Sequence, residues 1–204
     1  MKPLILALDT TRETGGLALM RGGELLEDLE LHAPSGFAHV LYGHLRDLLD
    51  RHSVKLEEID CFAAASGPGS FTGVRVGLAC VKGLAEAAGK PALGISNLQA
   101  LAWYGTAPLR AVVMDARRGE VYAAVYDDCL NPVSPEVVIQ LPDWLAALPQ
   151  PVEMIALEEK APRGLARAIA AIATAMYQRG EAQDPAALDA NYVRRSDAEL
   201  FWKD

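Results

Sequence analysis

The chain has 204 residues, and its 19 basic and 27 acidic side chains give a formal net charge of -8 and a pI of about 5.0. Apolar residues make up 51% and charged residues 23%, a balance that is typical of a folded protein and excludes an intrinsically disordered one. The acidic excess also excludes a surface that binds the phosphate backbone of a nucleic acid unaided, because such binding needs clustered lysine and arginine.

The first half of the chain predicts a β-rich α/β unit. It opens with three strands, over Leu4–Leu8, Gly16–Met20 and Glu24–Leu31, and the first of them is apolar throughout, as in a strand buried on both faces. A helix over Phe37–His52 follows, because its apolar residues form one stripe. The unit then continues with a buried strand over Cys61–Ser66, a glycine-rich loop at 67–73, a helix over 73–88, a strand over Ala92–Ile95 and a helix capped by Ser96.

The second half starts in the same way. An apolar strand over Leu109–Met114 ends in Asp115, as the first strand of the chain ends in Asp9, and a short polar turn and an alternating strand over Glu120–Asp127 follow. We interpret this as an internal duplication, with two unrelated hairpins in one mixed sheet as the alternative. The remaining predicted elements are a strand over Val152–Leu157, a helix over Pro162–Gln178 and a polar, extended arm over Asn191–Asp204.

The segment SGPGSFTG at 66–73 lies between a buried strand and a helix. In that arrangement backbone amides and the helix dipole can hold an anion, although the segment lacks the lysine of a Walker A loop and the spacing of a dinucleotide loop. The candidate residues for a nucleotide, ATP or ADP with Mg²⁺, are Asp9, Gly67, Gly69, Ser70 and Thr72. The structural alternative is a tight strand-to-helix crossing, with Thr72 as the helix N-cap and Asp9 and Asp115 as turn caps.

The helix over 73–88 has a second non-polar face beside its core stripe. This face consists mostly of small residues: Val76, Gly77, Cys80, Gly83 and Ala87. A helical glycine costs about 1 kcal/mol relative to alanine, so Gly77 and Gly83 need a packing reason. A second helix at close range would supply one, either the helix over 37–52 of the same chain or a helix of another subunit.

Neither a metal site nor a catalytic set is predicted. His39 and His44 lie about 140° apart around a helix, so they do not share a face. The three cysteines, Cys61, Cys80 and Cys129, are an odd number without C-x-x-C spacing, which favours a reducing compartment over a disulfide framework or a zinc ribbon. The longest apolar helical run is shorter than the ~20 residues of a membrane span. We therefore expect a cytoplasmic protein without membrane contact.

Four segments in order along the chain resemble the TsaB (YeaZ) family: LALDTT at 6–11, ASGPGSFTGVRVGLACVKGLA at 65–85, DARRGEVYAAVY at 115–126 and YVRRSDAE at 192–199. The resemblance implies an α/β, actin-like ATPase (ASKHA) fold of two tandem ribonuclease-H-like lobes, here 1–106 and 107–204. It also implies a non-catalytic dimerisation or scaffold subunit for N6-threonylcarbamoyladenosine formation at position 37 of tRNAs that read codons starting with A. The implied partners are a TsaD-like catalytic subunit, a TsaE-like ATPase and a second copy of the chain, with tRNA contacted only through the complex.

The resemblance further implies that the first two helices make the subunit contacts, which adds Leu41 and Leu45 to the small face of the second helix. Two departures stand out: Val40 and Leu41 follow His39 where many relatives have Ser-Glu, and EEKAPRG at 158–164 stands where the second lobe would carry its own glycine-rich loop. The missing loop favours a scaffold over the rival interpretation, an actin-fold ATPase or kinase that uses Asp9 and loop 67–73. A glycoprotease-like peptidase is a weaker rival.

Overall fold

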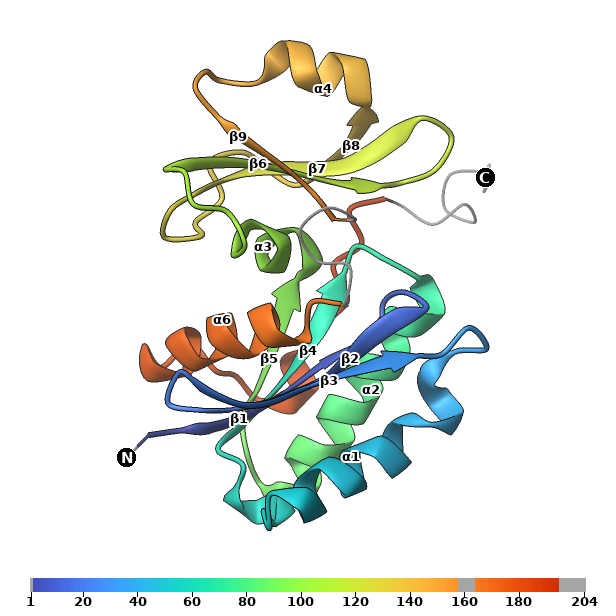
Figure 1. Cartoon of the computed structure of the whole chain (residues 1–204), viewed down its shortest axis with the longest axis vertical. Helices are drawn as coiled ribbons and strands as arrows, with labels where there is room; N and C mark the ends of the chain where they lie inside the picture. Colours follow the sequence, from blue (N-terminus) through green and yellow to red (C-terminus); the bar gives the residue numbers. More distant parts are fainter. Residues whose placement is uncertain (1, 158–163, 195–204) are drawn as a thin grey trace.

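The computed structural model describes residues 2–157 and 164–194, and it contains two β-sheets (Figure 1). The five-stranded sheet has the order β3-β2-β1-β4-β5, with β1 at Leu4–Asp9, β2 at Thr14–Arg21, β3 at Glu24–His32, β4 at Cys61–Gly67 and β5 at Ala92–Ser96. The four-stranded sheet has the order β8-β7-β6-β9, with β6 at Leu109–Asp115, β7 at Glu120–Asp127, β8 at Val137–Gln140 and β9 at Glu153–Ala156.

The two sheets repeat one pattern of strand order and direction. In the first, β1 is antiparallel to β2 and parallel to β4; in the second, β6 is antiparallel to β7 and parallel to β9. This agrees with the predicted duplication, and the alternative of one mixed sheet is wrong. The mixed α/β architecture confirms the predicted fold class.

Helices and sheets alternate as five layers. α1 (Leu41–Arg51) and α2 (Phe71–Ala88) cover one face of the first sheet, and α3 (Asn97–Ala102) and α6 (Ala166–Gln178) lie between the two sheets (Figure 1). α4 (Leu141–Ala147) covers the outer face of the second sheet. Short 3₁₀ turns stand at Phe37–His39, Leu56–Glu58 and Pro185–Ala187.

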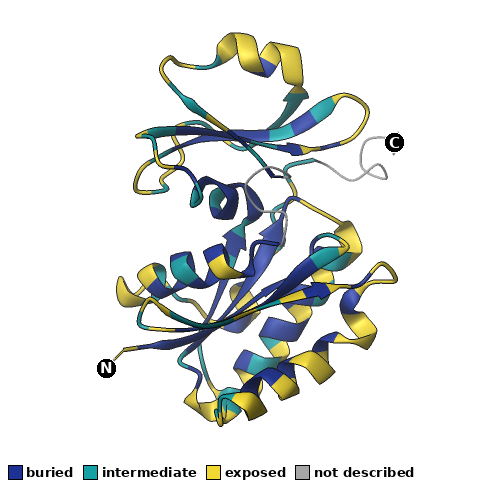
Figure 2. Cartoon of the chain, in the orientation of Figure 1, coloured by how far each residue is buried: buried dark blue, intermediate teal, exposed yellow. Residues whose placement is uncertain are grey.

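The layering explains why β1 is apolar at every position before Asp9. Leu4, Leu6 and Leu8 pack toward α1 and α2, whereas Ile5 and Ala7 pack toward α6. Because successive side chains of a strand point to opposite faces, a strand between two helical layers buries all of them. Figure 2 shows β1 and β4 of this sheet as buried and the outward faces of α1 and α2 as exposed.

Several elements differ from the prediction. The single helix expected over Phe37–His52 is a 3₁₀ turn followed by α1, because the amide of Val40 bonds the carbonyl of Phe37 in the tighter i to i+3 pattern. α2 begins at Phe71, two residues before the expected start, and its N-cap is Ser70 in place of Thr72. β8 and α4 were not predicted: β8 has only four residues, none of them buried, and α4 buries only Trp144.

The predicted lobe boundary, between residues 106 and 107, lies between the two sheets. α6 follows that boundary in the sequence, yet it packs against β1, β2 and β4 of the first sheet. Residues 158–163, which include the start of the predicted helix and most of the EEKAPRG segment, lie outside the described residues, as does the predicted arm beyond residue 194.

Candidate functional site

Asp9, at the end of β1, is fully buried and bonded on both carboxylate oxygens. Its Oδ1 accepts hydrogen bonds from the amide of Thr11 at 3.0 Å and from the hydroxyl of Thr11 at 2.7 Å. Its Oδ2 accepts the amide of Leu165, at the N-terminus of α6, at 2.9 Å. A carboxylate near the N-terminus of a helix is also stabilised by the helix dipole.

The bonds of Asp9 continue through the interior to the glycine-rich loop. Asn97 Nδ2 donates to the hydroxyl oxygen of Thr11 at 2.6 Å, and Asn97 Oδ1 accepts the amide of Gly67 at 3.0 Å. Asp9, Thr11, Asn97 and Gly67 thus form one buried network that joins β1, β4 and the first turn of α3. Asn97 was not among the predicted site residues, although it lies next to the predicted cap Ser96.

The glycines of the loop let it lie directly against residues 10 and 11. A Cβ atom built at Gly69 would lie 2.8 Å from Cβ of Thr11, and one at Gly73 would lie 2.1 Å from the backbone oxygen of Thr10. Gly67 has a φ of 106°, which favours glycine. The serine of the loop contributes to the same contact, because the amide of Ser70 donates to the carbonyl of Thr11 at 2.8 Å.

The structure brings the five predicted nucleotide-site residues to one end of the first sheet, but their exposure differs. Gly69, Ser70 and Thr72 are exposed, whereas Asp9 and Gly67 are buried. An Mg²⁺ ion needs carboxylate oxygens that it can reach, and those of Asp9 face protein donors in a buried network. The arrangement of Asp9 therefore does not fit a Mg–nucleotide group. Asp115, its counterpart, is exposed and accepts the amide of Arg117 at 2.7 Å as a turn cap.

The seven predicted interface residues divide into three groups. Leu41, Leu45, Gly77 and Cys80 are buried within the core of this chain, Val76 is half-buried, and Gly83 and Ala87 are exposed. The packing reason expected for Gly77 is Thr10, whose hydroxyl would lie 2.6 Å from an added Cβ, and not a second helix. A Cβ at Gly83 meets none of the described atoms within 4 Å.

The same two helices also expose aromatic residues that were not predicted as part of a site. Tyr42 on α1 is 59% exposed, and Phe71 at the start of α2 is 50% exposed. The guanidinium carbon of Arg75 lies 3.7 Å from the centre of the Phe71 ring, a cation–π contact. Burial raises the pKa of the Cys80 thiol to about 11, and a hydrogen bond with Tyr42 opposes that shift.

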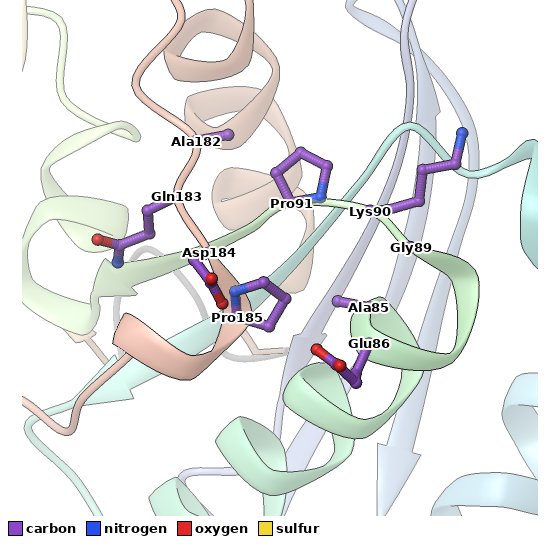
Figure 3. Close-up of a pocket in the computed structure, with 9 residues that line it drawn as sticks. All are labelled: Ala85, Glu86, Gly89, Lys90, Pro91, Ala182, Gln183, Asp184 and Pro185. Atoms are coloured by element: carbon purple, nitrogen blue, oxygen red, sulfur yellow. The ribbon is translucent and has the colours of Figure 1, made fainter.

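Two further features lie apart from this end of the sheet. Among the described residues, Asp127, Asp128 and Cys129 place possible metal-ligand atoms within 4.8 Å of one another. The carboxylate of Asp127, however, already accepts two hydrogen bonds from Asn131. A depression of about 370 Å³ lies at the C-terminal end of α2 (Figure 3). It is lined by Ala85, Glu86, Gly89, Lys90, Pro91 and residues 182–185. No helix of the described residues is long and apolar enough to cross a membrane.

The chain matches a family model described as TsaD, tRNA N6-adenosine threonylcarbamoyltransferase, over residues 33–185. It is 32% identical to the Bacillus subtilis tRNA threonylcarbamoyladenosine biosynthesis protein TsaB over 149 residues, 71% of this chain and 65% of that protein. It is 37% identical to the Escherichia coli protein of the same name over 126 residues, 60% of this chain and 54% of that protein. The chain thus matches between about half and two thirds of the length of these curated relatives.

A solved structure of YeaZ from Pseudomonas aeruginosa superimposes on this chain with a TM-score of 0.79 and 28% sequence identity. The superposition covers 93% of this chain and 99% of that one. The likeness therefore extends over both sheets and is not confined to the segment around the glycine-rich loop.

Proposed function

Because this chain belongs to the TsaB (YeaZ) family and carries the domain of the TsaD model, we propose that it acts in the formation of N6-threonylcarbamoyladenosine at position 37 of tRNAs that read codons starting with A. In this proposal a TsaD-like subunit transfers the threonylcarbamoyl group, and this chain is its non-catalytic partner. A TsaE-like ATPase joins the complex, the chain also pairs with a second copy of itself, and tRNA is contacted only through the complex.

The observation that carries the non-catalytic role is the engagement of Asp9. The rival ATPase or kinase would use this carboxylate to hold nucleotide-bound Mg²⁺. Instead the side chain is wholly buried and accepts hydrogen bonds from Thr11 and Leu165. A buried carboxylate whose partners are protein donors supports the fold, because losing those bonds would leave a charge in the interior.

The docking role rests on the outer face of α1 and α2. Tyr42, Ala79, Gly83 and Ala87 are exposed there, and Val76 is half-buried beside them. Small residues let a partner backbone approach closely, and an exposed tyrosine is a common anchor in protein interfaces. The buried members of the predicted set, such as Leu41 and Cys80, pack in the core beneath this face and hold the two helices on the sheet.

Depletion of the protein, followed by mass spectrometry of tRNA nucleosides, tests the proposal. We expect threonylcarbamoyladenosine to fall on depletion and to be restored by the wild-type chain. Gly83→Arg should fail to restore it, because the new side chain projects from the docking face. Ala175→Arg, at an exposed position of α6, is the matched control and should restore it.

Three results would contradict the proposal. An unchanged nucleoside level after depletion, with no second copy of the gene, removes the role in tRNA modification. ATP turnover by the purified chain would favour the ATPase, and digestion of casein would favour the peptidase.

A further inference from the structure

The last described residues, 188–194, lie outside the helices and strands, and we call this segment the C-terminal arm. It starts at Leu188, which is buried in the core between the first sheet and α2. It ends at Arg194, which pairs with Glu120 at the start of β7 in the second sheet. Figure 1 shows this red end of the chain passing from the first sheet to the second. The arm therefore touches both lobes.

The arm lies on the strand end from which the glycine-rich loop emerges. The amide of Asn191 donates to the carbonyl of Ser66 at 2.7 Å. A Cβ atom built at Gly67 would lie 3.0 Å from the backbone oxygen of Asn191, so the two backbones are in direct contact. The arm thus lies directly on Ser66 and Gly67.

One carboxylate, that of Glu136, receives donors from both lobes and from the arm. Tyr126 of β7 donates its hydroxyl to Oε1 at 2.5 Å, and Ser96, at the end of β5, donates to the same oxygen. Asn191 Nδ2 donates to Oε2 at 2.5 Å. Burial, followed by the charge of Glu136, raises the pKa of Tyr126, so its hydroxyl remains a donor.

Beyond Asn191, the arm is held by a side-chain cluster at the start of α2. The rings of Tyr192 and Phe71 have centroids 5.7 Å apart, and Arg75 Nε donates to the Tyr192 hydroxyl at 3.0 Å. Along the arm, Asn191 thus bonds Glu136, Tyr192 contacts the first lobe, and Arg194 pairs with Glu120 of the second lobe. Contacts with the two lobes alternate along the arm.

We propose that the C-terminal arm is an interlobe strap anchored on Glu136, which holds the two lobes together over Ser66 and Gly67 and uncovers these two residues when it is released. Glu136 is the anchor because its carboxylate accepts hydrogen bonds from Ser96, Tyr126 and Asn191 and because its charge strengthens each of them. Removing it leaves Ser96, Tyr126 and Asn191 without their common acceptor. The strap goes beyond the proposed role in tRNA modification and does not depend on it.

Amide hydrogen exchange of the full chain, followed by mass spectrometry, tests the strap. In Glu136→Ala we expect exchange in the peptides covering residues 188–194 and 66–70 to rise roughly tenfold to hundredfold, the factor that corresponds to losing a hydrogen bond to a charged group. Exchange in α1 should stay at the wild-type rate. Glu181→Ala is the matched control, because Glu181 is an exposed carboxylate that pairs with Arg179 two residues away. It should leave the arm protected.

The proposal is overturned if the peptides covering 188–194 and 66–70 exchange in Glu136→Ala at the same rate as in the wild-type protein. If that variant does not fold, Asn191→Ala decides the question, because it keeps the bonds of Glu136 to Ser96 and Tyr126 and removes only the side-chain donor of the arm. Faster exchange at 188–194 and 66–70 in this variant supports the strap, and unchanged exchange in both peptides overturns it.

Discussion

The carboxylate of Asp9 accepts the backbone amide of Leu165 at 2.9 Å, although 156 residues separate the two in the sequence. Asp9 ends β1, and Leu165 directly precedes α6, which packs against that strand. The bond therefore fixes the start of the helix on the sheet that the helix covers. An aspartate that the sequence offers as a ligand for Mg²⁺ joins two distant parts of the fold.

Asp9→Asn should lower the free energy of unfolding by about 1–3 kcal/mol. The substitution replaces the buried carboxylate that accepts the backbone amides of Thr11 and Leu165 with a neutral side-chain amide, which is a weaker acceptor. Urea denaturation measures this change. Asp115→Asn is the control: Asp115 is exposed and accepts one amide, so we expect a loss below about 1 kcal/mol. Equal losses in the two variants would show that the buried bonds of Asp9 add nothing.

Two glycines of α2 should respond in opposite ways to alanine. Gly83→Ala should raise the free energy of unfolding by about 0.5–1 kcal/mol, because its Cβ meets none of the described atoms within 4 Å and alanine is the better helix former. Gly73→Ala should be strongly destabilising, because its Cβ would lie 2.1 Å from the carbonyl oxygen of Thr10. Thermal unfolding distinguishes the two, and a stable Gly73→Ala protein would contradict the close contact between the loop and residue 10.

Acid should remove the stabilising contribution of Glu27. Hydrogen bonds from Arg51 lower the pKa of this carboxyl below its ordinary 4.5, His52 adds to the shift, and burial opposes it. Because the folded-state pKa lies below the unfolded-state value, the contribution is present above pH 4.5 and is lost as the pH falls through the folded-state pKa.

Glu27→Gln should therefore flatten the dependence of the urea midpoint on pH below 4.5. Glu57→Gln, at an exposed position of a 3₁₀ turn, is the control and should keep the wild-type slope. A wild-type slope in Glu27→Gln would contradict the assignment to this carboxyl.

In the folded protein a thiol reagent should modify Cys129 alone. Burial raises the pKa of Cys61 to about 12 and that of Cys80 to about 11, so neither forms the reactive thiolate near neutral pH. Cys129 is exposed and therefore accessible to the reagent. Because the charge of neighbouring Asp128 raises the pKa of this thiol, its reaction should speed up as the pH is increased. Mass spectrometry after alkylation should find one modified cysteine in native buffer and all three in denaturant, and alkylated Cys61 or Cys80 in native buffer would be inconsistent with the described core.

Local patterns in the sequence predict most of the elements correctly. The uniform apolarity of β1 requires two covered faces, and the structure places α2 on one and α6 on the other. Ser96 is the predicted cap of α3, and its hydroxyl oxygen accepts the amides of Leu98 and Gln99. These features depend on residues close together in the sequence, so a single chain reveals them.

The candidate site depends on contacts between residues that lie far apart in the sequence, and local sequence patterns do not predict such contacts. Gly77 and Gly83 predict a close neighbour, but the sequence does not show that the neighbour of Gly77 is Thr10 or that a Cβ at Gly83 meets none of the described atoms within 4 Å. Likewise, Glu136 and Asn191 meet only because the C-terminal arm crosses from one sheet to the other. Spacing also placed Cys80 on the face offered to a second helix, because a helix stripe does not reveal which of its two neighbouring faces the fold covers, and the resemblance added Leu41, which is buried.

The position of α6 has a consequence for how the protein is synthesised. The helix covers a face of the first sheet, but the ribosome makes it after all the strands of both sheets. At about 5–20 residues per second, the chain from Ser96 to Gln178 takes roughly 4 to 16 s to emerge. Throughout that interval the nascent first sheet presents Ile5, Ala7 and their neighbours to solvent, the kind of surface that chaperones bind. The first lobe is the first to be translated but cannot be the first to finish folding.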